Sequence, residues 1–190
     1  MKKYNLFIPL LVLVVFLGAC SIKDNSSTKK HEDKVDLKED TKENLDVVTL
    51  KEKALDFPLE IIDYEILVQD DELKSLYPDL YSVTVKNNSE VDIKEYKVAL
   101  LGWDENDLPV KIKGDIDFSD GSYTKTLIAS DVNLIPGATD GDDGGLGLDK
   151  NISLKTLQPI IISFTDFDDN VTKNEDAEPF IKAIEGKKIK

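Results

Sequence analysis

The central part of the chain repeats short apolar runs in which every second residue is polar. In residues 81–86, with the sequence YSVTVK, the tyrosine and both valines fall on one face and the polar residues on the other. Such alternation is the pattern of a strand with one buried face. Residues 93–103 extend the pattern, and we therefore expect Val83 and Leu100 to be core residues.

Further strands are predicted where apolar, β-branched runs are bounded by turn-forming residues. These runs cover residues 59–68, 127–134 and 157–167, with a short return strand at 109–113. Pro136 followed by Gly137 suits a type II turn, because proline fixes φ and glycine accepts a positive φ. Short strands at fairly regular spacing predict an all-β domain over residues 47–186, built as an immunoglobulin-like β-sandwich.

Two helices are also predicted beside the strands. Residues 177–184 are expected to form a short C-terminal helix, because Pro179 lies in its first turn, where proline is tolerated. Residues 44–55 are expected to form a second short helix, since Leu45, Val48 and Leu55 share one face at helical spacing.

The first twenty residues carry a different pattern. Two lysines precede an apolar run at residues 6–17, which is shorter than the ~20 residues that a membrane span needs. The run ends in LGAC, whose Cys20 is the only cysteine of the chain. This segment resembles the signal peptide of a bacterial lipoprotein, with small residues beside the cleavage site. The alternatives are an uncleaved membrane helix and a core helix.

The resemblance to lipoproteins implies a fate for each part of the N-terminus. Residues 1–19 would be removed as a signal peptide, and the Cys20 thiol would carry a diacylglycerol group, with palmitate as a further fatty acid. Two or more acyl chains anchor a protein stably, whereas a single acyl chain gives only marginal membrane binding. The protein is then expected at the outer face of the cell membrane, lipid-anchored.

Residues 20–46 mix charges of both signs with isolated apolar residues. This composition buries too little surface to offset the conformational entropy of the chain. We therefore expect a flexible charged tether between the lipid and the domain. His31, the only histidine, lies in this tether and is expected to be solvated.

Composition narrows the chemistry of the domain. The chain holds 38 acidic and 24 basic residues, and its formal net charge of -14 argues against a nucleic acid partner. With no cysteine or histidine in residues 47–186, serine–histidine, cysteine–histidine and histidine–zinc chemistry are excluded there. Paired carboxylates could still serve a hydrolase, but only in a pocket that raises one pKa. The sequence predicts no enzyme and no cofactor.

An acidic, glycine-rich segment at residues 139–150, TDGDDGGLGLDK, is the sharpest candidate site. Its carboxylates could supply oxygen ligands to Ca²⁺, although the spacing fails the EF-hand template. The alternative is a solvated loop that binds a partner protein, and we expect the first three carboxylates to contribute to binding and not to folding. The candidate ligands are Asp140, Asp142, Asp143 and Asp149.

Two further groups of residues each have two interpretations. The acidic run at residues 166–170 is predicted to be a hairpin turn in which Asp and Asn cap local backbone, with a metal site as the weaker alternative. The aromatic side chains are predicted to pack in the core, with a ligand platform as the weaker alternative. These aromatic residues are Tyr77, Tyr81, Tyr96 and Trp103.

Residues 58–167 are similar to a family of Gram-positive lipoprotein domains of unknown function. The motifs that carry the similarity are YPD at 77–79, KNNS at 86–89 and WD at 103–104. The middle portion also resembles FxLYD-type extracellular modules, which are immunoglobulin-like sandwiches. The chain departs from them at Gly102, where a large apolar residue is usual, and at Asp107, where glycine is usual. The resemblance implies a fold and a location, and it implies no catalytic site.

These observations combine into one functional expectation. The protein is predicted to be an extracytoplasmic lipoprotein of a Gram-positive bacterium that presents a non-catalytic interaction or accessory module. Its expected contacts are the membrane, through the lipid anchor, and another extracytoplasmic protein. A calcium-binding module that uses residues 139–150 is the alternative.

Overall fold

The computed structural model describes residues 37–70, 72–73, 76–141 and 144–189. Cys20 and the expected signal peptide lie outside these ranges, as do Asp142 and Asp143. The helices are α1 (Leu37–Leu55) and α2 (Ala177–Ile184). The strands are β1 (Leu59–Leu67), β2 (Leu80–Asn87), β3 (Ile93–Trp103), β4 (Lys125–Leu134), β5 (Thr139–Asp140), β6 (Leu146–Gly147), β7 (Thr156–Asp166) and β8 (Val171–Lys173).

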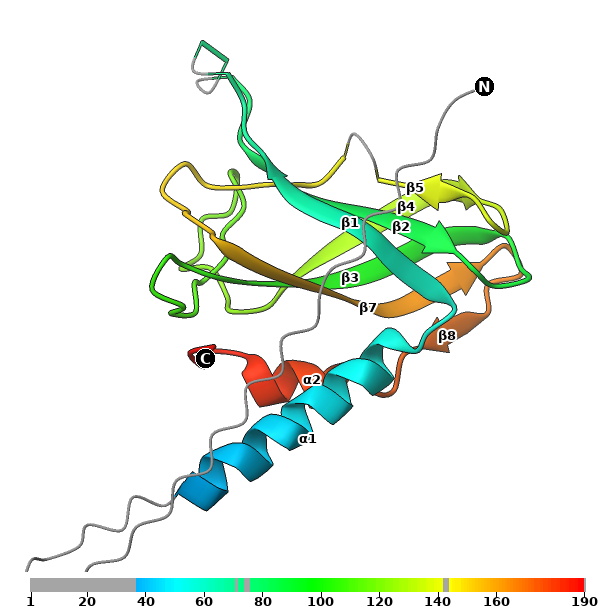
Figure 1. The fold of residues 1–190 in the computed structure, drawn as a ribbon. Helices are drawn as coiled ribbons and strands as arrows, with labels where there is room; N and C mark the ends of the chain where they lie inside the picture. Colours follow the sequence, from blue (N-terminus) through cyan, green and yellow to red (C-terminus); the bar gives the residue numbers. More distant parts are fainter. Residues whose placement is uncertain (1–36, 71, 74–75, 142–143, 190) are drawn as a thin grey trace, which may run out of the picture. The chain divides into compact units, whose positions relative to one another are not determined.

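The strands form two antiparallel sheets that face each other, so the predicted all-β sandwich is confirmed (Figure 1). Sheet A has the order β1-β2-β5, with β6 also pairing with β2, and sheet B has the order β4-β3-β7-β8. The return strand predicted at residues 109–113 is wrong. That segment makes only isolated bridges, from Pro109 to Trp103 and from Ile112 to Ser122, and forms no continuous ladder.

The main core lies between the two sheets. Val83 and Leu100 are both buried there, at 2% and 0% exposure, which confirms both predictions. The inward faces of β2 and β3 supply most of this core, as the alternation predicts. The buried inward residues of these two strands are Tyr81, Val83, Val85, Ile93, Tyr96, Val98 and Leu100.

A second core lies on the other face of sheet B, where both helices pack (Figure 1). Ala99, Leu101 and Trp103 of β3 point into it and are at most 2% exposed. Phe180 of α2 and Ala54 of α1 cover them. Strand β3 is therefore apolar on both faces, and the molecule has three layers.

Buried polar side chains tie the helical layer to the sheet. The Asn174 side-chain amide donates to the carbonyl oxygens of Ala54, at 2.8 Å, and of Ile161, at 2.9 Å. The Trp103 indole N–H donates to the Lys187 carbonyl oxygen at 2.7 Å. Because buried polar groups need partners, these contacts fix where the helices sit on sheet B.

Helix α1 is longer than the helix predicted at residues 44–55. It begins at Leu37, so residues 37–46, expected to belong to the flexible tether, are helical. Val47, Leu50 and Ala54 anchor its C-terminal half on the second core. Once packing fixes one half, helix propagation into the lysine- and glutamate-rich residues that precede it costs little.

Candidate functional site

The acidic segment pairs with β2 at two places, through β5 at residues 139–140 and through β6 at residues 146–147. Asp140 lies opposite Val85, and Leu146 lies opposite Tyr81. The Leu148 N–H then donates to the Asp79 carbonyl oxygen at 2.8 Å. A Cβ atom on Gly145 would lie 2.5 Å from the Tyr81 carbonyl oxygen, so this close approach requires glycine.

This course along β2 separates the expected calcium ligands. Asp140 pairs with Val85 of β2, and Leu148 contacts Asp79, just before β2. These two partners are six residues apart, which corresponds to roughly 20 Å in a strand. Asp140 and Asp149 therefore cannot hold one ion, and the predicted four-aspartate ligand set is corrected. In the described part of the chain, no three His, Cys, Asp or Glu side chains are grouped to hold a metal ion.

Asp140 has a different role in the fold. The buried Tyr96 hydroxyl donates to Asp140 Oδ2 at 2.8 Å and so links sheet B to sheet A. Burial, followed by this hydrogen bond, raises the pKa of Tyr96 above its usual value. Asp140 thus makes a folding contact, contrary to the expectation that its carboxylate contributes to binding alone.

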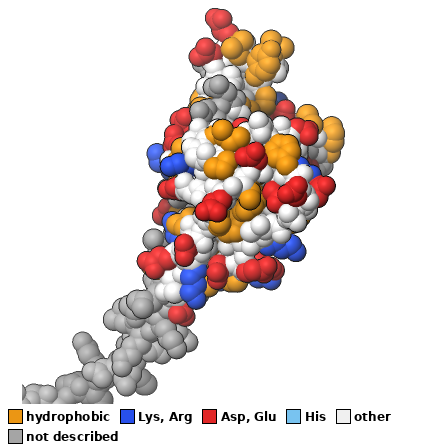
Figure 2. Space-filling model, turned by 90° about the vertical axis from the view of Figure 1, so that its right-hand side faces the viewer, with side chains coloured by type: hydrophobic (Ala, Val, Ile, Leu, Met, Phe, Trp, Pro, Cys, Tyr) orange, Lys and Arg blue, Asp and Glu red, His pale blue; other side chains and the backbone are white. Residues whose placement is uncertain are grey.

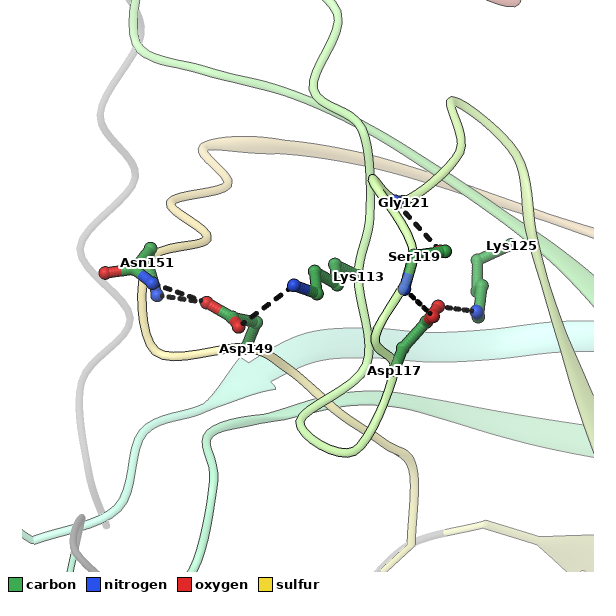
Figure 3. Close-up of polar contacts among 7 residues, drawn as sticks. All are labelled: Lys113, Asp117, Ser119, Gly121, Lys125, Asp149 and Asn151. Carbon is green, nitrogen blue, oxygen red and sulfur yellow. Dashed lines mark hydrogen bonds and ion pairs between the residues drawn. The ribbon is translucent and has the colours of Figure 1, made fainter.

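Asp149 lies at the other end of the segment, in a group of polar contacts (Figure 3). Its Oδ1 atom accepts from the Asn151 backbone N–H at 2.9 Å and from the Asn151 side-chain amide at 2.8 Å. The Lys113 ammonium lies 3.8 Å from Oδ2. The Asn151 backbone hydrogen bond is the main cause that lowers the pKa of Asp149. Its carboxylate is therefore ionised and accepts hydrogen bonds.

Asp117 repeats this arrangement on the neighbouring loop (Figure 3). Lys125 Nζ lies 2.5 Å from Asp117 Oδ2, and the Ser119 N–H donates to Oδ1 at 2.9 Å. The hydrogen bond from Lys125 is the main cause that lowers the pKa of Asp117. Both carboxylates in this region are suited to bind cations, and neither is suited to donate a proton as a general acid.

A cleft of about 320 Å³ opens beside Asp149, between the start of β2 and the chain after β6. Apolar side chains from Tyr77, Pro78 and Leu148 line it together with the carboxylates of Asp115 and Asp149. An apolar wall with acidic and basic side chains at its rim, Lys150 among them, fits an amphipathic group. No sequence pattern predicted a site here, although the YPD motif at 77–79 forms one of its walls.

Large apolar side chains are exposed around this cleft. Leu76 and Tyr77 are 73% and 58% exposed, and Ile116 and Phe118 on the facing loop are 81% and 100% exposed. Figure 2 shows hydrophobic side chains over the projecting connection between β1 and β2. Exposed apolar groups gathered at one end of a domain are typical of a contact surface.

The remaining predicted groups have structural roles. Asp166 caps the β7–β8 turn, because its Oδ1 accepts from the N–H groups of Asp168 and Asn170 at 2.9 Å each, and Asp169 has a positive φ of 66°. The hairpin interpretation of residues 166–170 is thus confirmed. Core packing is also confirmed for Tyr81, Tyr96 and Trp103, which are at most 2% exposed, whereas Tyr77 is exposed.

None of the described helices is long and apolar enough to cross a membrane.

No curated protein matches the chain. A crystal structure of a hypothetical protein from Peptoclostridium difficile 630 is similar in fold, with a TM-score of 0.57 and 17% sequence identity, over 70% of this chain and 94% of that chain. The model of a family of unknown function, DUF5780, matches residues 80–187, which is more than half of the sequence, and the chain therefore belongs to that family.

Proposed function

We propose that the protein is a lipoprotein, anchored through Cys20 at the outer face of the membrane, whose β-sandwich is a non-catalytic interaction module. The observation that carries the proposal is the sequence of residues 1–20. A basic start, a short apolar run and LGAC occur in that order, and the chain has no other cysteine.

The chemistry of the domain supports a binding role. Among the residues that the structure describes, the five carboxyl groups with shifted pKa values are all shifted downward, chiefly by hydrogen bonds from backbone, asparagine or lysine groups. Ionised, hydrogen-bonded carboxylates accept contacts but do not supply the protonated acid that carboxylate hydrolysis needs. The apolar surface around the cleft adds area for a partner protein.

A Gram-positive source is part of the proposal. It is supported by the similarity in fold to a protein of Peptoclostridium difficile 630. With one membrane, such a cell would display the domain directly outside it, at the end of the charged segment after Cys20.

Metabolic labelling with a fatty acid tests the anchor. The full-length chain is expressed in a Gram-positive host, and the labelled protein is followed through detergent partitioning. Wild type should incorporate label and enter the detergent phase, whereas Cys20→Ser should do neither. Ser21→Ala is the matched control, because it alters the neighbouring residue and leaves the thiol. If Cys20→Ser remains equally membrane-bound, the anchor is an uncleaved helix and the proposal is wrong.

A further inference from the structure

Strand β4 forms one edge of sheet B. In the order β4-β3-β7-β8 it pairs with β3 on one side, and within the described residues no other strand pairs with it. An unpaired strand edge presents a row of backbone N–H and C=O groups that another extended chain can pair with.

Backbone contacts at the end of β3 settle the direction of its groups. The Gly102 carbonyl accepts from the Val110 N–H at 3.0 Å, on the side of β4, and the Trp103 carbonyl accepts from the Lys155 N–H at 2.7 Å, on the side of β7. The backbone N–H and C=O groups of successive residues point to alternate sides of a strand. Those of Leu100 therefore point toward β4, like those of Gly102, and Leu100 pairs there with Lys125.

The same alternation applies to β4. Lys125, Leu127 and Ala129 lie opposite the residues of β3 that face β4, so their N–H and C=O groups are used in the ladder. The groups of Thr126, Ile128 and Ser130 point away from the sheet. The side chains of these three residues are exposed as well. The free edge therefore offers three residues at the spacing of a strand.

A trough of about 640 Å³ runs along this edge and separates β4 from the segment after β5. Its floor includes Val83 and Tyr96, and its far wall includes Gly141, Gly144 and Gly145. Gly141 and Gly145 lie against β2, but a Cβ atom on Gly144 would meet nothing within 4 Å. The three glycines of this wall that the structure describes add no side chains to the trough.

We propose that the edge of β4 binds an extended, lysine- or arginine-bearing segment of a partner protein, which adds a strand to sheet B and lies over the trough. Main-chain hydrogen bonds would supply affinity, and the trough would take every second side chain. Asp140 lines the trough, and Asp131 lies in β4 between the lining residues Ser130 and Val132, so acidic residues favour cationic side chains here. Asp131 has a positive φ of 58°, and the register shifts after Ser130, so the usable edge ends there.

Charge also selects among possible occupants. A second copy of the chain would bring two domains of the same sign together, since the formal net charge is -14. That repulsion disfavours pairing of two β4 edges and favours a basic segment. The inference deepens the interaction-module proposal by naming the kind of partner, and it rests on that proposal for the role of the binding.

The experiment uses the full-length chain in detergent and a fluorescent peptide in which four lysines alternate with three valines. The key variant is Ile128→Pro, which removes one outward N–H and no ladder hydrogen bond. Ile128→Thr is the matched control, because it removes the same exposed side chain and keeps the N–H. Fluorescence anisotropy measures affinity, and thermal melts verify folding.

We expect wild type and Ile128→Thr to bind the peptide alike, and Ile128→Pro to bind at least about tenfold more weakly, with an unchanged melting temperature. Hydrogen exchange of the wild type gives a second measure, which does not depend on the proline variant folding. The peptide should slow exchange at Thr126, Ile128 and Ser130. A peptide with glutamate in place of lysine should bind more weakly.

Three results would overturn the inference. They are no binding of the lysine–valine peptide at about 1 mM, equal binding by both Ile128 variants, and slowed exchange confined to residues outside β4. Dimers in light scattering that Ile128→Pro abolishes would assign the edge to a second copy instead. Fatty-acid labelling at Cys20 is independent of all these results, so a failure here leaves the proposed anchor standing.

Discussion

The two sheets of the sandwich differ in what covers their outer faces. The outward residues of β2 in sheet A are Ser82, Thr84 and Lys86, which are polar. The corresponding residues of β3 in sheet B are Ala99, Leu101 and Trp103, which are apolar and buried under the helices. The two strands have similar inward faces but differ in their outward faces. The apolar outward residues of β3 therefore decide that the helices pack on sheet B.

This difference divides the stability of the fold into two parts that can be probed separately. The inter-sheet core holds the sandwich together, and the second core attaches the helices to sheet B. If the helices belong to the cooperative unit, damage to either core should unfold the whole domain in one transition.

The largest effect is expected from Phe180→Ala in α2. Phe180 is 2% exposed in the second core, and loss of a buried phenylalanine costs about 3–5 kcal/mol. Urea unfolding followed by circular dichroism measures the loss. Thr84→Ala on the outer face of sheet A is the control and should stay within ~0.5 kcal/mol. A small loss for Phe180→Ala would mean that the helices are accessory to the sandwich.

Leu100→Ala in the inter-sheet core should cost about 2–5 kcal/mol, because its side chain is fully buried. The same urea titration applies. Fluorescence of Trp103, in the other core, should report the same midpoint as circular dichroism. Separate midpoints would show that the two cores unfold independently. A loss below ~1 kcal/mol would contradict the assigned strand register.

Two tyrosines cross between the sheets in opposite directions and should make the fold sensitive to alkali. The Tyr81 hydroxyl donates to the Leu101 carbonyl at 3.1 Å, and Tyr96 donates to Asp140. Burial raises the pKa of both hydroxyl groups. The unfolded chain releases these protons near pH 10 while the folded chain keeps them, so stability is full below pH 10 and falls as pH rises above it.

The expected slope is about 1.4 kcal/mol per pH unit for each tyrosine once the pH exceeds the unfolded pKa. Denaturation measured from pH 8 to 11 gives this slope. The double variant Tyr81→Phe/Tyr96→Phe should lose the part of the slope that the tyrosines cause and keep the part that the lysines cause. An unchanged slope in the double variant would show that neither hydroxyl is held in its protonated form.

The smallest effects compare the two ends of the segment along β2. Asp140→Ala leaves the buried Tyr96 hydroxyl without an acceptor, which costs about 1–3 kcal/mol. The cost should vanish in a Tyr96→Phe background, and a double-mutant cycle by thermal melts measures this. Asp149→Ala should change the melting temperature less, because its contacts are exposed. The opposite ranking would contradict the assigned role of Asp140.

Much of the sandwich was predictable from local pattern. The alternation of β2 and the long apolar run of β3 gave their positions, and the bounds of β3 and α2 agree with the prediction. Ala138 N–H donates to the Ile135 carbonyl at 3.0 Å around Gly137, with φ of 81°, as a type II turn requires. The packing of the two helices on the outer face of sheet B was not predicted. The continuous apolar run VALLGW at residues 98–103 indicates it, because a strand that is apolar on both faces is covered on both faces.

The candidate site was less predictable, for a physical reason. Residues 139–149 have loop composition, and no local pattern indicates that they pair with β2, more than fifty residues earlier in the sequence. Long-range pairing alone separates Asp140 from Asp149. The trough beside β4 was equally invisible, because its walls come from segments that are joined only by tertiary structure.

The hold of Asn174 on Ala54 has a mechanical consequence. A pull on the chain ahead of α1 reaches the sandwich only through that helix, whose last turn is fastened to Asn174 and thereby to β7. The load would fall on the helical layer and on sheet B. Strand β1 and sheet A follow α1 in the sequence, so the Asn174 contacts would shield them from the pull. A domain tethered at its N-terminus could therefore bear tension while the free edge of β4 keeps its shape.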